Sequence, residues 1–232
     1  MKMKPWNRLP EFMQCDEVKI YYDILSKKKL QLLLKRAFDL MAAMIMLIIL
    51  AIPILIIAII IKIDSPGPVL YLQERVTSYG KKFNIHKFRT MVDKADRIGS
   101  AVTIEGDKRI TKVGAYLRRL RIDEIPQLID VITGNMSFVG TRPEVIKYVN
   151  QYTKEMYATL LLPAGITSEA SIRYKDEAAI LATAQDIDKE YLEKVLPQKM
   201  RYNLQSIRNF SLIGEIRTML RTVFAVFGKH YE

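Results

Sequence analysis

A long apolar run dominates the hydropathy pattern of the first third of the chain. Residues 40–61 carry no charge and consist almost wholly of Leu, Ile, Met and Ala. As one α-helix this run would be about 33 Å long, enough to cross a hydrocarbon core of about 30 Å. Pro53 interrupts it near the middle, where a proline removes a backbone hydrogen bond and kinks a helix. The pattern therefore fits either a single span or a re-entrant hairpin.

Basic residues flank both ends of the apolar run. Lys35 and Arg36 precede it, and Lys62 and Arg75 are among those that follow it. The positive-inside rule then gives no clear sidedness, as expected for a hairpin that enters and leaves by one face. The run lies too far from the N-terminus for a cleavable signal peptide, and no small-residue cleavage site follows it.

The residues before the run are basic and mixed. Residues 26–36 place five Lys and Arg side chains around leucines, which is typical of an interfacial helix on anionic lipid but equally of a solvated helix start. Residues 1–25 show no clear period. We therefore divide the chain into an N-terminal segment with a basic interfacial helix (1–36), a membrane helix kinked at Pro53 (37–63) and a globular domain (64–232).

The remaining pattern predicts an α+β fold that is mostly helical. A turn cluster at 64–68 precedes two alternating segments, 69–76 and 83–89, which we predict to pair as a short β-hairpin across Ser78-Tyr79-Gly80. Residues 134–143 are predicted as a loop, and residues 163–167 as a helix break. Helices are predicted at 91–98, from Thr111, at 123–132, from Pro143 towards Leu162, at 176–184, at 186–196 and at 202–227.

The net charge and the cysteine content limit which binding partners and which cellular compartment to expect. Lys+Arg 36 against Asp+Glu 25 gives a net charge of +11. Such a balance suggests an anionic partner: nucleic acid, an anionic membrane surface or phosphorylated small molecules. The single cysteine, Cys15, excludes an internal disulfide and suits a cytosolic site.

Two adjacent carboxylates stand inside an arginine-rich stretch, Arg118-Arg119-Leu120-Arg121-Ile122-Asp123-Glu124-Ile125-Pro126-Gln127. Asp123 is a good helix N-cap, and Pro126 is tolerated in a first helical turn. At the positive end of a helix dipole, beside guanidinium groups, both an ionised carboxylate and a bound phosphate are favoured. The stretch therefore predicts either a capped helix start with a solvated acidic turn or a site that handles anions.

Phosphate chemistry is the reaction class that these residue types suit. It needs a nucleophile, cations for the phosphate oxygens and often Mg²⁺ held by carboxylate oxygens, and an Asp can attack phosphorus to form an acyl phosphate. Lys87, Arg89, Arg118 and Arg142 are candidates for holding phosphate, although each alone is more often an ion-pair residue. The chain lacks a Walker A loop, a GxGxxG, a zinc-spaced Cys/His set and a Ser/His/Asp arrangement, and we interpret His86 as a strand residue.

The order of several short motifs resembles one family, the bacterial sugar transferases, which are monotopic polyprenyl-phosphate phosphoglycosyl transferases. The resemblance covers about residues 35–167 in consistent order. The matching segments are 35–39, 67–69, 73–75, 87–91, 107–114, 117–119, 123–128, 134–140, 142–143 and 163–167. A set ordered in this way is far more specific than any one of its members.

The resemblance implies a reaction and a location. It implies transfer of a sugar-1-phosphate from a UDP-sugar to a polyprenyl (undecaprenyl) phosphate with release of UMP, in a Mg²⁺-dependent ping-pong reaction. It also implies a helix that re-enters the bacterial inner membrane at Pro53, so that both of its ends and the catalytic domain face the cytoplasm. Anionic membrane lipid is then the expected surface partner and nucleic acid is not, while the sugar, the glycan pathway and the oligomeric state stay open.

The resemblance also implies roles for individual residues. Asp123 takes the position of the nucleophile and Glu124 that of its partner in metal or proton handling, so both are candidate Mg²⁺ ligands. Lys87, Arg118 and Arg142 match positions associated with phosphate and donor binding. Beside them, Arg89 and Pro143 complete the predicted substrate-binding set.

Some positions depart from the family pattern, and one rival function fits the charge. Ile52 stands where a serine is frequent, Thr77 and Thr141 stand where Gly and Pro are usual, and Asn203 stands where an acid is common. Residues 168–171 read Ser-Glu-Ala-Ser rather than the commoner Gly-Leu continuation. The rival is a non-catalytic, membrane-tethered adaptor whose basic face binds anionic lipid or nucleic acid, but it leaves the ordered acidic pair unexplained.

Overall fold

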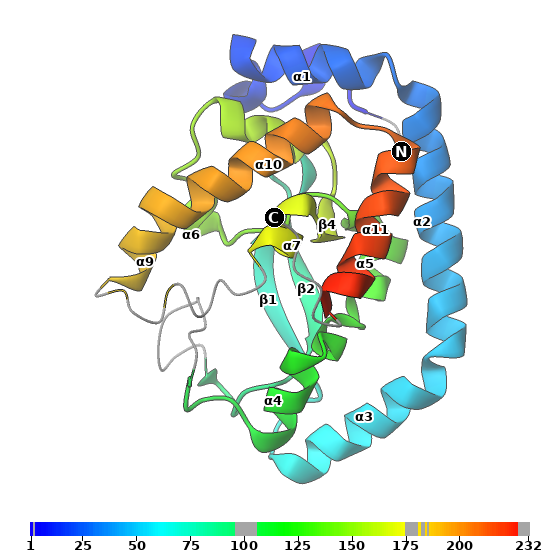
Figure 1. Cartoon of the computed structure of the whole chain (residues 1–232), viewed down its shortest axis with the longest axis vertical. Helices are drawn as coiled ribbons and strands as arrows, with labels where there is room; N and C mark the ends of the chain where they lie inside the picture. Colours follow the sequence, from blue (N-terminus) through cyan, green and yellow to red (C-terminus); the bar gives the residue numbers. More distant parts are fainter. Residues whose placement is uncertain (2, 96–105, 175–180, 182–183, 185, 227–232) are drawn as a thin grey trace.

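The chain folds into a mostly helical domain edged by a bent helix pair. A computed structural model describes residues 1, 3–95, 106–174, 181, 184 and 186–226 (Figure 1). The longer helices are α1 (Asp16–Ser26), α2 (Lys29–Ile49), α3 (Ala51–Asp64), α4 (Lys112–Arg119), α5 (Gln127–Thr133), α10 (Leu196–Arg208) and α11 (Leu212–Val226). The strands are β1 (Leu70–Val76), β2 (Lys82–Phe88), β3 (Met136–Val139) and β4 (Ala164–Thr167). The predicted mixture of many helices and little sheet is confirmed.

The predicted apolar run is not one straight helix. Helices α2 and α3 meet at Leu50 with a bend of 62°. Pro53 lies in the first turn of α3, and its ring and missing N–H are incompatible with a helical bond to the carbonyl of Ile49, so the bend falls just before the proline. No single described helix is long and apolar enough to cross a membrane, whereas this bent pair passes that test of length and composition.

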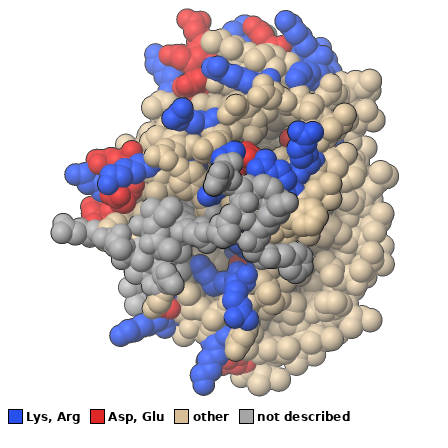
Figure 2. Space-filling view, in the orientation of Figure 1, with Lys and Arg blue, Asp and Glu red and all other residues tan. Residues whose placement is uncertain are grey.

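The outer face of α2 and α3 is apolar although it is exposed. Ile48, Ile52 and Ile63 are 77%, 72% and 80% exposed, and the edge of the molecule along this pair is almost without charged side chains in Figure 2. The inner face of α2 carries buried Leu32, Lys35, Asp39 and Ala43 at helical spacing. The helix predicted over 26–36 is therefore divided between the end of α1 and the start of α2, and Lys35 faces the protein.

The basic residues that begin the apolar run fasten it to the domain. Lys35 Nζ donates to the carbonyl oxygen of Val139 at 3.1 Å and forms ion pairs with Asp39 and Glu215. Ser137 Oγ in turn donates to Asp39 Oδ2 at 2.8 Å. These contacts connect α2 to β3 and α11, and we refer to Lys35, Asp39, Ser137 and Glu215 as the anchor cluster.

The short strands form two separate pairs. Strands β1 and β2 are the predicted antiparallel hairpin, with Arg75 opposite Phe83 and Tyr71 opposite Lys87. Strands β3 and β4 pair in parallel, so residues predicted as a loop and as a helix break are strands instead. A Cβ on Gly165 would lie 2.2 Å from the backbone nitrogen of Gly140, which explains why glycines stand where these two segments cross.

Several predicted helices have other limits. The helix expected from Pro143 to Leu162 is replaced by the short α6 (Ile146–Val149) and the 3₁₀ segment η6 (Glu155–Leu161). Residues 91–95 form a bridge and a turn rather than the start of a helix, and the rest of that prediction, like nearly all of 176–184, lies outside the described residues. The stretch 186–196 is helical as predicted, as α9 (Ile187–Glu190) and η7 (Tyr191–Val195).

The C-terminal helix expected over 202–227 is two helices. Helix α10 ends at Arg208 and α11 starts at Leu212, with Phe210 buried between them and its carbonyl oxygen bonded to Lys28 Nζ at 2.5 Å. Ser211 Oγ accepts the backbone N–H of Gly214, which caps the new helix. Residue 227 lies outside the described residues.

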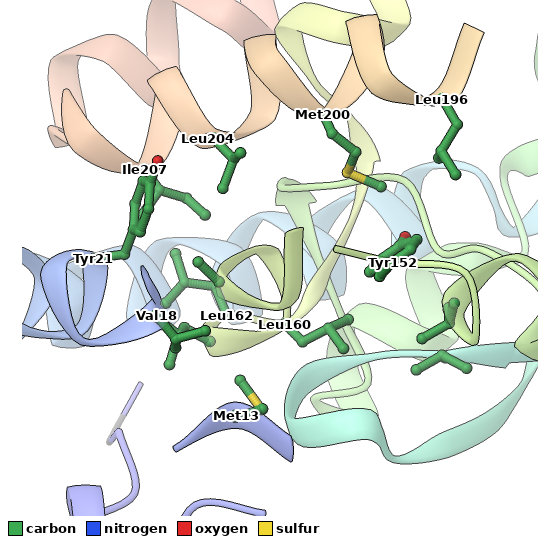
Figure 3. Packing of buried hydrophobic residues seen from close by; sticks show 14 of the residues in the cluster. Met13, Val18, Tyr21, Tyr152, Leu160, Leu162, Leu196, Met200, Leu204 and Ile207 are labelled. Atoms are coloured by element: carbon green, nitrogen blue, oxygen red, sulfur yellow. The ribbon is translucent and has the colours of Figure 1, made fainter. Parts of the chain in front are cut away.

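The main core lies between the N-terminal segment and α10. Figure 3 shows Val18 and Tyr21 of α1 beside Leu160 and Leu162 of the η6 region, with Leu204 and Ile207 of α10 above them. Helix α1 therefore closes this core. The 3₁₀ turns η1 (Trp6–Arg8) and η2 (Glu11–Met13) lead into it, and Met13 is fully buried.

Candidate functional site

The acidic pair lies in its own short turn, which the chain reaches through a left-handed residue. Thr111 caps α4 as predicted, and its side chain accepts the N–H of Gly114. After α4, Arg121 adopts φ 57° and ψ 17°, an uncommon conformation for a non-glycine residue. Asp123 and Glu124 then fall in the 3₁₀ turn η5 (Ile122–Glu124), so the prediction that Asp123 caps a helix is wrong. The following helix α5 ends at Gly134 as predicted.

Glu124 is held by two cations from distant parts of the chain. Arg142 Nη2 lies 2.5 Å from Glu124 Oε1, and Lys87 Nζ lies 3.1 Å from the same oxygen. Lys87 comes from β2, and Arg142 from the segment after β3. Burial opposes ionisation of Glu124, but Arg142 and Lys87 outweigh it and hold the pKa of this carboxyl well below its usual range.

Asp123 is buried beside the same cations but is not tied to them. Its side chain forms no hydrogen bond or ion pair with the described residues, although only 8% of the residue is exposed. Burial raises the pKa of Asp123, and the negative charge of Glu124 raises it further, against the opposing charges of Lys87, Arg118 and Arg142. The result is a carboxylate that is more basic than an ordinary Asp and has no hydrogen-bond or ion-pair partner among the described residues.

Arg118 is the third cation of the site. It is half-buried on the last turn of α4 and forms no hydrogen bond or ion pair within the described part of the chain. Burial lowers the pKa of Arg118, and the charge of Asp123 opposes that shift. Burial likewise lowers the pKa of Lys87 against the charge of Glu124. Three cations thus face two carboxylates, and the surplus positive charge favours an anionic ligand.

The structure separates Arg89 from the other predicted substrate-binding residues. Its guanidinium group donates to the carbonyl oxygens of Ser65 and Pro66 at 2.6 Å and 2.8 Å, at the end of α3. Pro143 stays beside Arg142 in the chain, and its carbonyl oxygen accepts a bond from Arg75 at 3.2 Å. Of the predicted set, Lys87, Arg118 and Arg142 therefore gather around the acidic pair.

Sequence reasoning missed Arg75, which lies beside this group, and Asp130, a buried carboxylate of α5. Arg75 lies on the hairpin face that also carries Phe83 and Ile85, and Gln73 Oε1 accepts from its Nε and Nη2 at 3.0 Å and 2.6 Å. Lys87 lies on this same face, so a second cation at the matching strand parity was the available signal. Asp130 of α5 is fully buried and bonds Nδ1 of His86 at 2.8 Å, and no sequence motif marked that pair.

Asp123 and Glu124 could supply two of the ligands of a bound cation but not a complete ligand set. The described residues contain no group of three or more His, Cys, Asp or Glu side chains arranged to hold a metal ion. Mg²⁺, however, is commonly bound by one or two carboxylates together with substrate phosphates rather than by a protein cage. Asp123 and Glu124 therefore fit such a shared site, because neither carboxylate is fully enclosed by protein donors.

The family is settled by comparison with known proteins. A model of the family described as "Bacterial sugar transferase" matches residues 30–229. The chain belongs to the bacterial sugar transferase family. The match covers α2 to α11 and therefore every residue of the site, and it leaves η1, η2 and α1 outside.

Three relatives of this sugar transferase illustrate the range of lengths. The exopolysaccharide production protein PSS of Rhizobium leguminosarum bv. phaseoli is 47% identical over 205 residues, covering 84% of this chain and 95% of that protein. The UDP-N-acetylgalactosamine-undecaprenyl-phosphate N-acetylgalactosaminephosphotransferase of Aeromonas hydrophila is 35% identical over 202 residues. The UDP-glucose:undecaprenyl-phosphate glucose-1-phosphate transferase of Escherichia coli K12 is 36% identical over 200 residues. The chain spans only 44% and 40% of the length of the latter two relatives.

Proposed function

We propose that this sugar transferase moves a sugar-1-phosphate from a UDP-sugar to undecaprenyl phosphate and releases UMP. The observation that carries the proposal is the state of Asp123, a buried carboxylate that has no bonded partner in the described part of the chain and lies next to Lys87, Arg118 and Arg142. The names of the relatives, which specify UDP-sugars and undecaprenyl phosphate, support the same reaction.

The chemistry proceeds in two displacements at one phosphorus atom. An oxygen of Asp123 attacks the β-phosphorus of the UDP-sugar, the bond from that phosphorus to the bridging oxygen breaks, and UMP leaves with the electron pair. A phosphate oxygen of the lipid then attacks the same phosphorus, the bond to Asp123 breaks, and the lipid diphosphate sugar forms with a free carboxylate. Arg118, Arg142 and Lys87 stabilise the negative charge on the phosphate oxygens in both steps.

The proposal includes magnesium as a group that would balance the charge of the donor diphosphate. Asp123 and Glu124 are the carboxylates that would hold it together with the diphosphate. When bound, it would neutralise charge on the diphosphate oxygens. Glu124, paired with Arg142 and Lys87, keeps those two side chains beside the reacting carboxylate.

We further propose that α2 and α3 enter the inner membrane and return to its cytoplasmic side. The exposed apolar face of this pair and its 62° bend support a re-entrant placement, which would bring the lipid phosphate close to the site. Tags placed at residue 1 and residue 232 should both report the cytoplasm. Tags on opposite sides would restore a single-pass span.

Trapping the covalent intermediate tests the reaction. Purified protein incubated with a UDP-sugar and Mg²⁺, without lipid acceptor, should gain the mass of a sugar phosphate on the peptide that contains Asp123. A screen of UDP-sugars for UMP release would identify the donor. If the Asp123→Ala variant released UMP and made lipid diphosphate sugar at the wild-type rate, the assignment of the nucleophile would be wrong.

A further inference from the structure

A second buried cluster of charged side chains is attached to the segment that carries Arg142. It has no role in the two displacements proposed above. At its centre is Glu144, which is 6% exposed. The O–H of Tyr191 donates to Glu144 Oε1 at 2.5 Å, and Lys199 Nζ lies 3.8 Å from the same oxygen. Lys199 Nζ also donates to the oxygen of Tyr191 at 3.2 Å. The cluster therefore joins three separate parts of the chain: the segment after β3, η7 and α10.

Arg75 connects this cluster to the segment that carries Arg142. Its Nη1 donates to the carbonyl oxygen of Pro143 and lies 4.0 Å from Glu144 Oε2. Its Nε and Nη2 both donate to Gln73. Each of the three guanidinium nitrogen atoms thus donates to a protein oxygen, which ties Arg75 to Gln73 and to the segment that carries Arg142.

The segment between Gly140 and α6 depends on such anchors. Residues 141–145 have no regular secondary structure, yet they must place Arg142 Nη2 2.5 Å from Glu124 Oε1. Two backbone bonds hold the segment, from Gly165 N to the oxygen of Thr141 at 2.8 Å and from Val76 N to the oxygen of Glu144 at 3.0 Å. The side chains add further contacts, because Arg75 donates to the carbonyl oxygen of Pro143 and Glu144 accepts from Tyr191.

We propose that Glu144, Tyr191, Lys199 and Arg75 form a positioning network that sets the location of Arg142 for the donor diphosphate. The inference rests on the proposed function, because it assumes that Arg142 binds the donor. Stability alone explains such a network poorly, since a buried ion pair contributes little net stability compared with apolar residues of similar size. A network that joins η7 and α10 to Arg142 also makes donor binding depend on the C-terminal helices.

A pair of matched tyrosine variants tests the positioning role. Tyr191→Phe removes the O–H that donates to Glu144. The control, Tyr148→Phe, removes an equally short O–H bond, to Asp188 Oδ1 at 2.5 Å, from the ring that packs on Tyr191 at 4.8 Å. We expect the KM for the UDP-sugar to rise roughly tenfold in Tyr191→Phe with a smaller change in kcat, and to stay at the wild-type value in Tyr148→Phe. An equal rise in both variants, or in neither, would overturn the proposal.

Lysine variants and an exchange measurement separate this inference from the proposed function. Lys199→Met should raise KM like Tyr191→Phe, whereas Lys194→Met, which removes an exposed ion pair with Glu190, should not. Amide hydrogen exchange at Val76, whose N–H is bonded to the carbonyl of Glu144, should become faster in Tyr191→Phe and remain unchanged in Tyr148→Phe. If the wild-type protein released no UMP from any UDP-sugar, the proposed function would fail, and unchanged exchange at Val76 would independently overturn the positioning role.

Discussion

Two buried charged groups in this sugar transferase differ in how completely their charges are paired. In the anchor cluster, Lys35 bonds Val139, Asp39 and Glu215, and Ser137 completes the contacts of Asp39. Around η5, Glu124 is paired twice, while Asp123 and Arg118 form no hydrogen bond or ion pair with the described residues. Buried charged side chains that stabilise a fold are usually paired with one another, whereas those of a ligand site are often left unpaired by the protein.

The largest expected difference between the groups follows from replacing one carboxylate in each. Asp123→Asn should lower the rate of UMP release at least about 10⁴-fold, because an amide cannot act as the nucleophile. Its thermal stability should not fall, since a buried charge without a partner is removed. Asp39→Asn should instead lose stability and retain activity per folded molecule. Substantial UMP release by Asp123→Asn, or inactivity of well-folded Asp39→Asn, would break the comparison.

Removing the anchor cation should destabilise the fold. Lys35→Met leaves Asp39 and Glu215 buried without their cation, a change that typically costs about 3–5 kcal/mol and would lower the unfolding midpoint by roughly 6–20 °C. The matched control is Lys19→Met, which removes an ion pair whose side chains are 42% and 50% exposed and should shift the midpoint by only a few degrees. Thermal unfolding in detergent measures both, and equal shifts would contradict the structural role of Lys35.

Replacing Arg118 should lower activity without lowering stability, the reverse of the result expected for Lys35. Arg118→Met should lower kcat/KM by about 10²–10³-fold, because it removes positive charge where negative charge develops in the transition state. Its unfolding midpoint should stay level or rise, since no partner is left without a counter-ion. Steady-state kinetics and thermal unfolding on the same preparation measure the two effects. A loss of stability as large as that of Lys35→Met would show that Arg118 also maintains the fold.

The smallest expected effect is a shift in pH dependence. The first displacement needs ionised Asp123, so its rate should rise with pH through the pKa of Asp123, which lies above the ordinary 3.8, and level off beyond it. Glu124→Gln removes a negative neighbour and should move this limb to lower pH, while Lys87→Met removes a positive neighbour and should move it to higher pH, each by roughly one unit. Single-turnover formation of the adduct measures the limb. Shifts in the same direction would exclude Asp123 as the titrating group.

The sequence predicted best those features that depend on near neighbours in the chain. The apolar run, the hairpin and the adjacency of Asp123 and Glu124 are local features, and the structure has all three. The prediction that Asp123 caps a helix is wrong because Arg121 adopts a left-handed conformation, after which Asp123 and Glu124 form the separate 3₁₀ turn η5. The hydropathy pattern did not predict the parallel pairing of β3 with β4. Each of these strands is only four residues long, and the two are far apart in the sequence.

By itself, the sequence determined the order of motifs, the long apolar run with Pro53 and the side-by-side carboxylates, because these depend on neighbours in the chain. Only the tertiary structure decided which charges are paired. It placed Lys35 on the protein side of α2, took Arg89 to the end of α3, and brought Lys87 and Arg142 to one oxygen of Glu124. Pairing and burial are set by distances between segments that are far apart in the sequence. These distances determine the pKa of Asp123 and leave its carboxylate without a hydrogen bond or ion pair to the described residues.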